Sequence, residues 1–190
     1  MIKVVASDPT AEELEAILSH PNAFYEIVDG EIVEKPQMSA FSRLIARRLF
    51  KALDEIATAQ RLGTAVHEWM LVLDPARPLK RQPDVAFVSF ERWPVDREIP
   101  EEGEWETIPD LAVEILSPRD LGRKTARKIR EYFRYGVKQV WIIQPETREI
   151  YVYESPKRIL VLDEEDDLDG GEIVRGFRLP VAELFRRTVS

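Results

Sequence analysis

Two acidic residues stand within or beside apolar segments that have the pattern of β-strands. Asp84 precedes the run Val-Ala-Phe-Val, and Glu114 lies inside Leu-Ala-Val-Glu-Ile-Leu. Burying an unpaired carboxylate costs so much free energy that such a group normally finds a cation or a proton. Two carboxylates with water molecules form the oxygen-rich site that Mg²⁺ prefers. Since a basic segment follows Glu114, the pattern predicts a metal-dependent site that acts on phosphate.

The two carboxylates can share a site only if their strands pair with a suitable stagger. Alternation along the strand at 110–116 places Asp110, Ala112 and Glu114 on one face. Asp110 and Glu114 are roughly 13 Å apart along that strand, which is too far to share one ion. Asp84, on the preceding strand, is therefore the predicted partner of Glu114. The competing interpretation makes Glu114 half of a structural ion pair, because structural networks also bury carboxylates.

A basic helix predicted at 123–135 supplies the candidate lysine. At about 100° per residue, Lys128 lies about 70° from the centre of the arc that packs on the sheet. Lys128 is therefore predicted to reach inward, although a lysine stem can also pack on the sheet while its ammonium reaches water. The opposite, solvated side carries four arginines: Arg123, Arg127, Arg130 and Arg134.

The remaining patterns predict a single α/β domain with a mixed central sheet flanked by helices. The expected elements are a short helix at 10–18, a hairpin at 24–35 around Asp29-Gly30, a long helix at 39–59, strands at 64–73, 84–90, 111–116, 139–143 and 149–153, and a loop at 91–109. Within one domain spanning 1–190, we expect a decoration at 1–38, a core at 39–153 and a C-terminal extension at 154–190.

Composition excludes several function classes. The chain has no cysteine and two histidines, which excludes disulfides, a thiolate nucleophile and cysteine-ligated metals and argues against a histidine-rich metal site. A net charge of -8 argues against non-specific coating of nucleic acid, but the bases gathered between Arg119 and Lys138 can hold a polyanion locally. No apolar run could span a bilayer and no signal peptide is recognisable, so we expect a cytoplasmic protein without a membrane partner.

The chain resembles the PD-(D/E)XK nuclease superfamily and, within it, a widespread bacterial family of restriction-endonuclease-like proteins that was formerly a domain of unknown function. The resemblance covers most of the sequence. It rests on Tyr-Glu-Ile-Val-Asp-Gly-Glu at 25–31, Pro-Asp-Val at 83–85, the segment 109–118, the segment 128–137 with its Tyr132 and Gly136, and Val-Trp-Ile-Ile-Gln-Pro at 140–145. It implies a restriction-endonuclease-like core with an N-terminal hairpin extension.

This resemblance implies that Asp84 and Glu114 bind Mg²⁺ or Mn²⁺, which activates water and stabilises the charge that develops on phosphate. The superfamily lysine normally lies two residues after the second acid, where this chain has Leu116. In the resembling family the lysine comes from the following helix, which selects Lys128. Glu26, in the family's hairpin motif, is implied as an additional acid near the metal.

The expected function is hydrolysis of DNA phosphodiester bonds, with Lys128 positioning or helping to deprotonate the attacking water. Phe41 stands where many resembling sequences have a histidine. This departure favours the alternative of a weakly active or inactive module that binds nucleic acid or protein; a hydrolase of smaller phosphate esters is a third class. We expect a homodimer, because Trp93, Trp105 and the loop 91–109 offer apolar surface and because cutting both strands suits a two-fold pair of sites.

Overall fold

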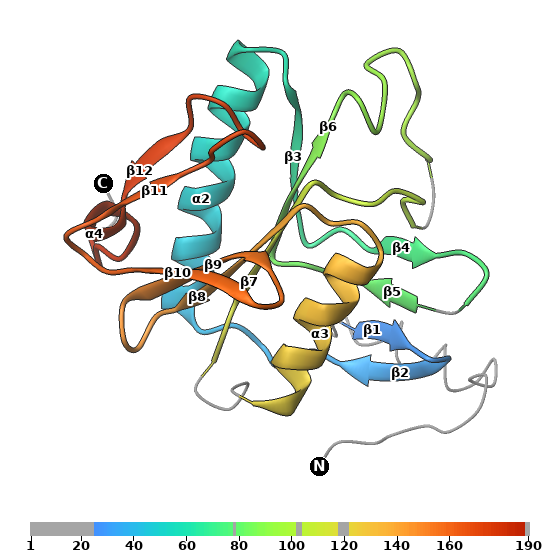
Figure 1. Ribbon diagram of the computed structural model, residues 1–190, viewed down its shortest axis with the longest axis horizontal. Helices are drawn as coiled ribbons and strands as arrows, with labels where there is room; N and C mark the ends of the chain where they lie inside the picture. The colour runs from blue at the N-terminus through green and yellow to red at the C-terminus, as the bar shows by residue number, and fades with distance from the viewer. Residues whose placement is uncertain (1–24, 78, 102–103, 118–121, 189–190) are drawn as a thin grey trace.

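The computed structural model describes residues 25–77, 79–101, 104–117 and 122–188 (Figure 1). The helix expected at 10–18 lies outside these residues. The elements are β1 Tyr25–Val28, β2 Glu31–Glu34, α2 Ala40–Ala59, β3 Gly63–His67, β4 Leu71–Asp74, β5 Leu79–Arg81, β6 Val85–Ser89, β7 Leu111–Ile115, α3 Arg123–Arg134, β8 Gln139–Gln144, β9 Glu149–Ser155, β10 Arg158–Leu162, β11 Asp167–Asp169, β12 Arg178–Pro180 and α4 Val181–Leu184.

A six-stranded central sheet has the order β10-β9-β8-β7-β6-β3, with α2 and α3 on its opposite faces (Figure 1). The pair of β7 and β8 is parallel and the other pairs are antiparallel, so the predicted mixed sheet flanked by helices is confirmed. Every residue of β7 is buried, as expected for a strand covered on both faces. Leu111 and Val113 join the core on the α2 side, while Ala112 joins the core on the α3 side.

The two long helices form where helical spacing predicts them. In α2, the apolar residues Ile45, Leu49 and Leu53 recur every four positions and are fully buried. Ser39 caps its N-terminus by accepting a hydrogen bond from the Ser42 amide at 3.0 Å. After α3, Gly136 takes a φ of +94°, the left-handed conformation that commonly ends a helix.

A second, four-stranded sheet of order β2-β1-β5-β4 packs beside the α3 face of the central sheet (Figure 1). The prediction of one strand at 64–73 is wrong, because β3 and β4 belong to different sheets. Glu68 lies between them with a φ of +56°, a sparsely populated conformation that ends the first strand. The strand β5 was not predicted, since three residues are too short to show a periodic pattern.

The loop at 91–109 does not present its tryptophans to solvent. Trp93 and Trp105 are 7% and 3% exposed, and their rings meet edge-to-face with centroids 5.1 Å apart. The Trp105 amide donates a hydrogen bond to the Met70 carbonyl at 2.9 Å, which anchors the loop to the smaller sheet. The expectation that these two residues offer apolar surface to a partner is therefore wrong, because both complete the core.

The C-terminal segment after residue 154 packs onto the same core. The strand β10 forms one edge of the central sheet by pairing with β9. Further along the chain, Leu168, Phe177 and Phe185 are buried in the core on the α2 side. The α3 side is left open to the smaller sheet, which brings residues from both sheets together there.

Candidate functional site

Asp84 and Glu114 meet at the start of β6 and the end of β7. The antiparallel register pairs Val85 with Val113, and one further residue along the same register places Asp84 opposite Glu114. Directly opposed side chains have Cβ atoms about 4.5–5.5 Å apart and share a face, here the face that α3 covers. Asp84 Oδ2 accepts a hydrogen bond from the Ile115 amide at 2.6 Å, which fixes its carboxylate across the two strands.

Lys128 reaches this pair from α3. Its Nζ lies 2.7 Å from Glu114 Oε1 and 2.6 Å from Glu26 Oε1, and its side chain is 15% exposed. The inward position that the helical angles predict for Lys128 is therefore confirmed, whereas its role in a reaction stays a prediction. The four arginines expected on the solvated side are exposed: Arg123, Arg127, Arg130 and Arg134.

Glu26 joins the cluster from the smaller sheet. Its Oε2 pairs with the Arg81 guanidinium at 2.7 Å, and its Oε1 accepts a hydrogen bond from the Gln82 amide at 3.1 Å. Burial alone would raise the pKa of Glu26, but the positive charges of Lys128, Arg81 and Lys35 outweigh it and lower this pKa to about 2. Glu26 is thus a carboxylate at neutral pH, and it holds Lys128 and Arg81 in place.

Lys35 is a site residue that the sequence reasoning missed. Its Nζ lies 2.9 Å from Asp84 Oδ1 and donates a hydrogen bond to the Gln82 carbonyl. Burial favours a lower pKa for Lys35, but Asp84, Glu114 and Glu26 raise it above its ordinary value. Lys35 follows the last residue of β2 and lies 49 positions from Asp84 in the chain. Neither strand alternation nor helical spacing could indicate this contact.

Tyr132 is the second unexpected member of the site. Its side chain is fully buried on the face of α3 that packs on the sheet, and its hydroxyl donates a hydrogen bond to Glu114 Oε1 at 2.6 Å. Burial, together with the nearby Glu114 and Glu26 charges, raises the Tyr132 pKa well above 10.0, so the hydroxyl stays a donor. Burial also raises the pKa of Glu114, although Lys128 and Lys35 oppose that change.

The cluster as a whole is electrically balanced. Its three buried acids are matched by three bases, which suits a site that is almost closed to solvent. The acids are Glu26, Asp84 and Glu114, and the bases are Lys35, Arg81 and Lys128. At its edge Arg81 also pairs with Glu131, whose charge is matched in turn by the exposed Arg127. Because the formal charge is zero, the cluster by itself does not attract an anionic phosphate.

The donor set of Asp84 and Glu114 fits a hard divalent cation whose shell is completed by water. The contacts that Lys128 and Tyr132 make with Glu114 both fall on Oε1. A hollow of about 10 Å³ beside Asp84, lined also by Lys35 and Arg43, has room for about one water molecule. Within the described ranges, no three histidine, aspartate or glutamate side chains are grouped to hold a metal without such additional ligands.

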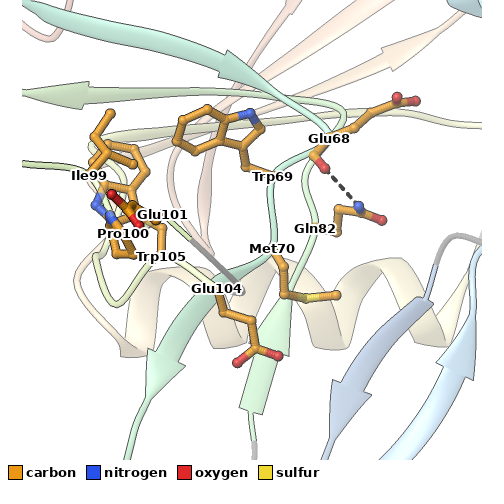
Figure 2. A pocket seen from close by; sticks show the side chains of 9 residues that line it. All are labelled: Glu68, Trp69, Met70, Gln82, Ile99, Pro100, Glu101, Glu104 and Trp105. Carbon is orange, nitrogen blue, oxygen red and sulfur yellow. Dashed lines mark hydrogen bonds between the residues drawn. The ribbon is translucent and has the colours of Figure 1, made fainter. Parts of the chain in front are cut away.

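A larger cavity of about 350 Å³ adjoins the cluster (Figure 2). Gln82 links the two. Its backbone N–H donates to Glu26 in the cluster, and its side-chain amide donates to the Glu68 carbonyl in the cavity wall at 2.7 Å, the contact drawn as a dashed line. Trp69 and Trp105 form an aromatic wall, with centroids 5.4 Å apart. The rim is acidic, since it carries Glu68, Glu101 and Glu104, of which only Glu104 pairs with a lysine, Lys80. The acidic rim of this cavity therefore disfavours a phosphate.

Asp110 lies at the opposite end of β7 from Glu114 and has a different environment. Its carboxylate accepts hydrogen bonds from the Ser89 amide at 2.8 Å and Arg92 at 2.9 Å, and it pairs with Lys138 at 2.8 Å. Burial would raise the pKa of Asp110, but these three donors lower it. Asp110 thus has the contacts of a structural ion pair and lies apart from the Glu114 site.

The two departures from the resembling family are both apolar packing residues. The Phe41 ring packs against the core on the α2 side, with the Arg187 guanidinium 5.0 Å from its centroid. Leu116, in the usual lysine position, packs against the core on the α3 side. An ammonium group does reach Glu114, but it belongs to Lys128 on the following helix.

Comparison with known proteins supports the same class of protein. Residues 11–182 match the model of the Uma2 family, described as "Putative restriction endonuclease". Among solved structures, the chain is similar to "a putative nuclease belonging to DUF820 from Anabaena variabilis ATCC 29413", with a TM-score of 0.72, 22% identity and coverage of 90% of this chain and 96% of that one. Identity at this level shows a shared fold. None of the curated proteins matches the chain. Of the helices described, none combines the length and the apolar character needed to cross a bilayer.

Proposed function

Because the chain belongs to the Uma2 family of restriction-endonuclease-like proteins, we propose that it is a metal-dependent endonuclease that hydrolyses phosphodiester bonds in DNA. One observation carries the proposal. Asp84 and Glu114 oppose each other on adjacent strands, and Lys128 contacts Glu114 from the next helix. A nuclease-type fold with this arrangement has the donor groups that phosphodiester hydrolysis requires.

Asp84 and Glu114 would hold Mg²⁺ or Mn²⁺ through their carboxylate oxygens. When bound, such a cation supplies activation of water and stabilisation of negative charge on phosphate. The charge balance of the cluster supports this role. With its own acids and bases matched, an added divalent cation makes the cluster positive, and a phosphodiester then becomes a favourable neighbour.

Lys128 would act as a hydrogen-bond donor. Its ammonium is engaged by Glu26 and Glu114 and has no lone pair with which to accept a proton. In the hydrolysis, a water oxygen forms a bond to phosphorus, the bond from phosphorus to the leaving oxygen breaks, and the leaving oxygen takes up a proton. Lys128 Nζ can hold a phosphate oxygen or the leaving oxygen in this step, which favours the positioning role over deprotonation of water.

The exposed arginines of α3 would hold the DNA backbone. Arg127 is half exposed, and Arg123, Arg130 and Arg134 share its side of the helix. The chain as a whole carries a net charge of -8, so contact with DNA would concentrate on this stripe. Binding should therefore weaken steeply as salt is added, since each neutralised phosphate releases counterions.

The test is cleavage of supercoiled and linear DNA by purified protein with Mg²⁺, with Mn²⁺ and with a chelator. Cleavage should require the metal and should be lost in Asp84→Asn and in Glu114→Gln, because each change keeps the side-chain shape but removes a charge from the metal site. Glu55→Gln is the matched control, since Glu55 is exposed on α2 and, among the described residues, pairs with Lys51 alone. Undiminished cleavage by the double variant Asp84→Asn, Glu114→Gln would show that the activity does not come from this carboxylate site.

A second candidate function is a binding module that uses the nuclease fold without cutting. It is favoured by Lys35 and Lys128, which already neutralise both carboxylates. Gel-shift titration with Ca²⁺ in place of Mg²⁺ separates the two candidates. Salt-sensitive DNA binding by a protein that cuts no DNA and hydrolyses no simple phosphate ester would favour the module.

We also propose a homodimer, since a nuclease that cuts both strands of a duplex benefits from two sites related by a two-fold axis. Trp93 and Trp105 are buried and cannot form its interface. Val95 and Ile99 of the loop 91–109 stay exposed, and Ile159, Leu160 and Val161 of β10 form another exposed apolar surface.

A further inference from the structure

The edge strand β10 exposes a run of apolar side chains. Ile159, Leu160 and Val161 are 46%, 55% and 48% exposed. On one side β10 pairs with β9, and no described strand pairs with its other side. Proteins usually protect a sheet edge with charges, proline or a bulge, because its free backbone groups can pair with another strand. Here the centre of the edge is apolar and the charges lie at its two ends. The register of β10 with β9 shifts between Arg158 and Ile159, and it is regular from Ile159 to Leu162.

The strand is complementary to a second copy of itself. Residues that face each other across an antiparallel pair alternate between hydrogen-bonded and non-hydrogen-bonded types. When a strand pairs with its own copy, a two-fold axis makes the residue pairs on its two sides equivalent, so these pairs must be of the same type. Because neighbouring pairs differ in type, the axis cannot pass between two neighbouring pairs and must pass through the centre of one pair. An axis through Leu160 places Ile159 opposite Val161 of the second copy, so that the exposed apolar side chains cover one another.

The charges at the ends select this antiparallel arrangement. Lys157 precedes the strand and Asp163 follows it, and neither forms an ion pair within the described part of the chain. With the axis through Leu160, Lys157 lies opposite Asp163 of the second copy, and the reverse contact forms at the other end. In a parallel pairing each end would face its own sign of charge, which is repulsive.

We propose that β10 pairs with β10 of a second copy about a two-fold axis through Leu160, joining the two six-stranded sheets into one. The axis is then perpendicular to the sheet, so both copies of α3 and both carboxylate clusters lie on the same face. This assigns a surface to the proposed homodimer. The pairing of the two strands is argued from β10 alone and does not rest on any enzymatic activity.

The position of the clusters relative to the axis follows from the register. Leu160 aligns with Val152, Val152 with Trp141 and Trp141 with Val113, the neighbour of Glu114. Both clusters therefore lie close to one line that crosses the joined sheet through the axis. Seven interstrand steps of about 4.8 Å separate the two copies of β7, a distance of about 34 Å.

A single cysteine tests the pairing in a chain that has none of its own. In Leu160→Cys, the two introduced thiols face each other across the axis, with Cα atoms about 4.5–5.5 Å apart, inside the range that a disulfide needs. Mild oxidation at micromolar concentration should give a covalent dimer on a non-reducing gel. Arg158→Cys is the matched control. The two introduced cysteines would be four residues apart in register, so this variant should give no covalent dimer. Equal cross-linking of both variants, or of neither, would overturn the assignment of β10.

A charge exchange gives a second readout. Lys157→Glu should shift the mass measured by light scattering from twice the chain mass towards that of one chain, because the introduced acid faces Asp163 of the second copy. Adding Asp163→Lys to the same chain should restore the dimer. Circular dichroism checks the fold, which should not change since both residues are exposed. A monomeric wild-type protein would refute the homodimer itself, whereas a dimer that ignores both charge changes would refute only its β10 surface. Neither measurement involves DNA, so both are independent of cleavage.

Discussion

Replacing Glu26 by glutamine should destabilise the protein in a way that depends on pH. The Glu26 carboxylate is 4% exposed and lies between Lys128 and Arg81. Its pKa falls from the ordinary 4.5 to about 2 on folding. Since a tenfold change in proton affinity is worth about 1.4 kcal/mol, the ionised carboxylate stabilises the folded state by about 3 kcal/mol. The general cost of breaking a buried ion pair, about 3–5 kcal/mol, agrees with this value.

The sign of the pH dependence follows from the lowered pKa. Stabilisation by Glu26 is complete above pH 4.5, where the unfolded chain is also ionised, and it disappears as the pH falls towards 2. Glu26→Gln should therefore lower the free energy of unfolding by about 3 kcal/mol at pH 7 but by only about 2 kcal/mol at pH 3.5.

Urea unfolding followed by tryptophan fluorescence measures both values, because Trp93, Trp105 and Trp141 are buried. Glu55→Gln is the control, since an exposed i,i+4 pair should contribute less than about 0.5 kcal/mol at either pH. If Glu26→Gln costs no more than this control at pH 7, or the same at both pH values, the electrostatic role assigned to Glu26 is wrong.

Three further changes probe the site and its frame. Lys128→Met keeps the stem but removes the ammonium, so DNA cleavage should be lost while DNA binding in a gel shift persists; retained cleavage would remove Lys128 from the reaction. Tyr132→Phe deletes the hydroxyl donor to Glu114, and it should lower the free energy of unfolding in urea by about 1–2 kcal/mol, with no loss contradicting the buried hydrogen bond. Gly63→Ala would place a Cβ 2.2 Å from the Val88 carbonyl oxygen and should cost about 1–3 kcal/mol, seen as a lower melting temperature; an unchanged value would contradict this close approach of β3 and β6.

The sequence predicts those parts of the site that depend on local periodicity. Strand alternation puts Glu114 and Ala112 on one face of β7, and helical angles turn Lys128 towards that face, as the structure confirms. Both patterns repeat over a few residues, so they do not depend on how the rest of the chain folds.

The parts that could not be predicted depend on where the smaller sheet packs. Lys35 reaches Asp84 only because the hairpin docks beside β6, and Arg81 reaches Glu26 through β5, a strand of three residues. These contacts join positions 49 and 55 apart in the sequence. No local pattern encodes them, and the break at Glu68 that allows the second sheet to form is a single backbone conformation.

On the proposed function, the lysines that face the two carboxylates would make metal uptake an exchange reaction. Lys35 bonds to Asp84 and Lys128 to Glu114, so a divalent cation can coordinate these oxygens only as the ammonium groups give them up. A displaced ammonium in so enclosed a place needs another anion, and the phosphate of a substrate is such an anion. Metal and substrate would then each strengthen the binding of the other, by equal factors as linkage requires. The protein without substrate would then bind metal poorly, and bound DNA would itself promote the metal binding that its cleavage requires.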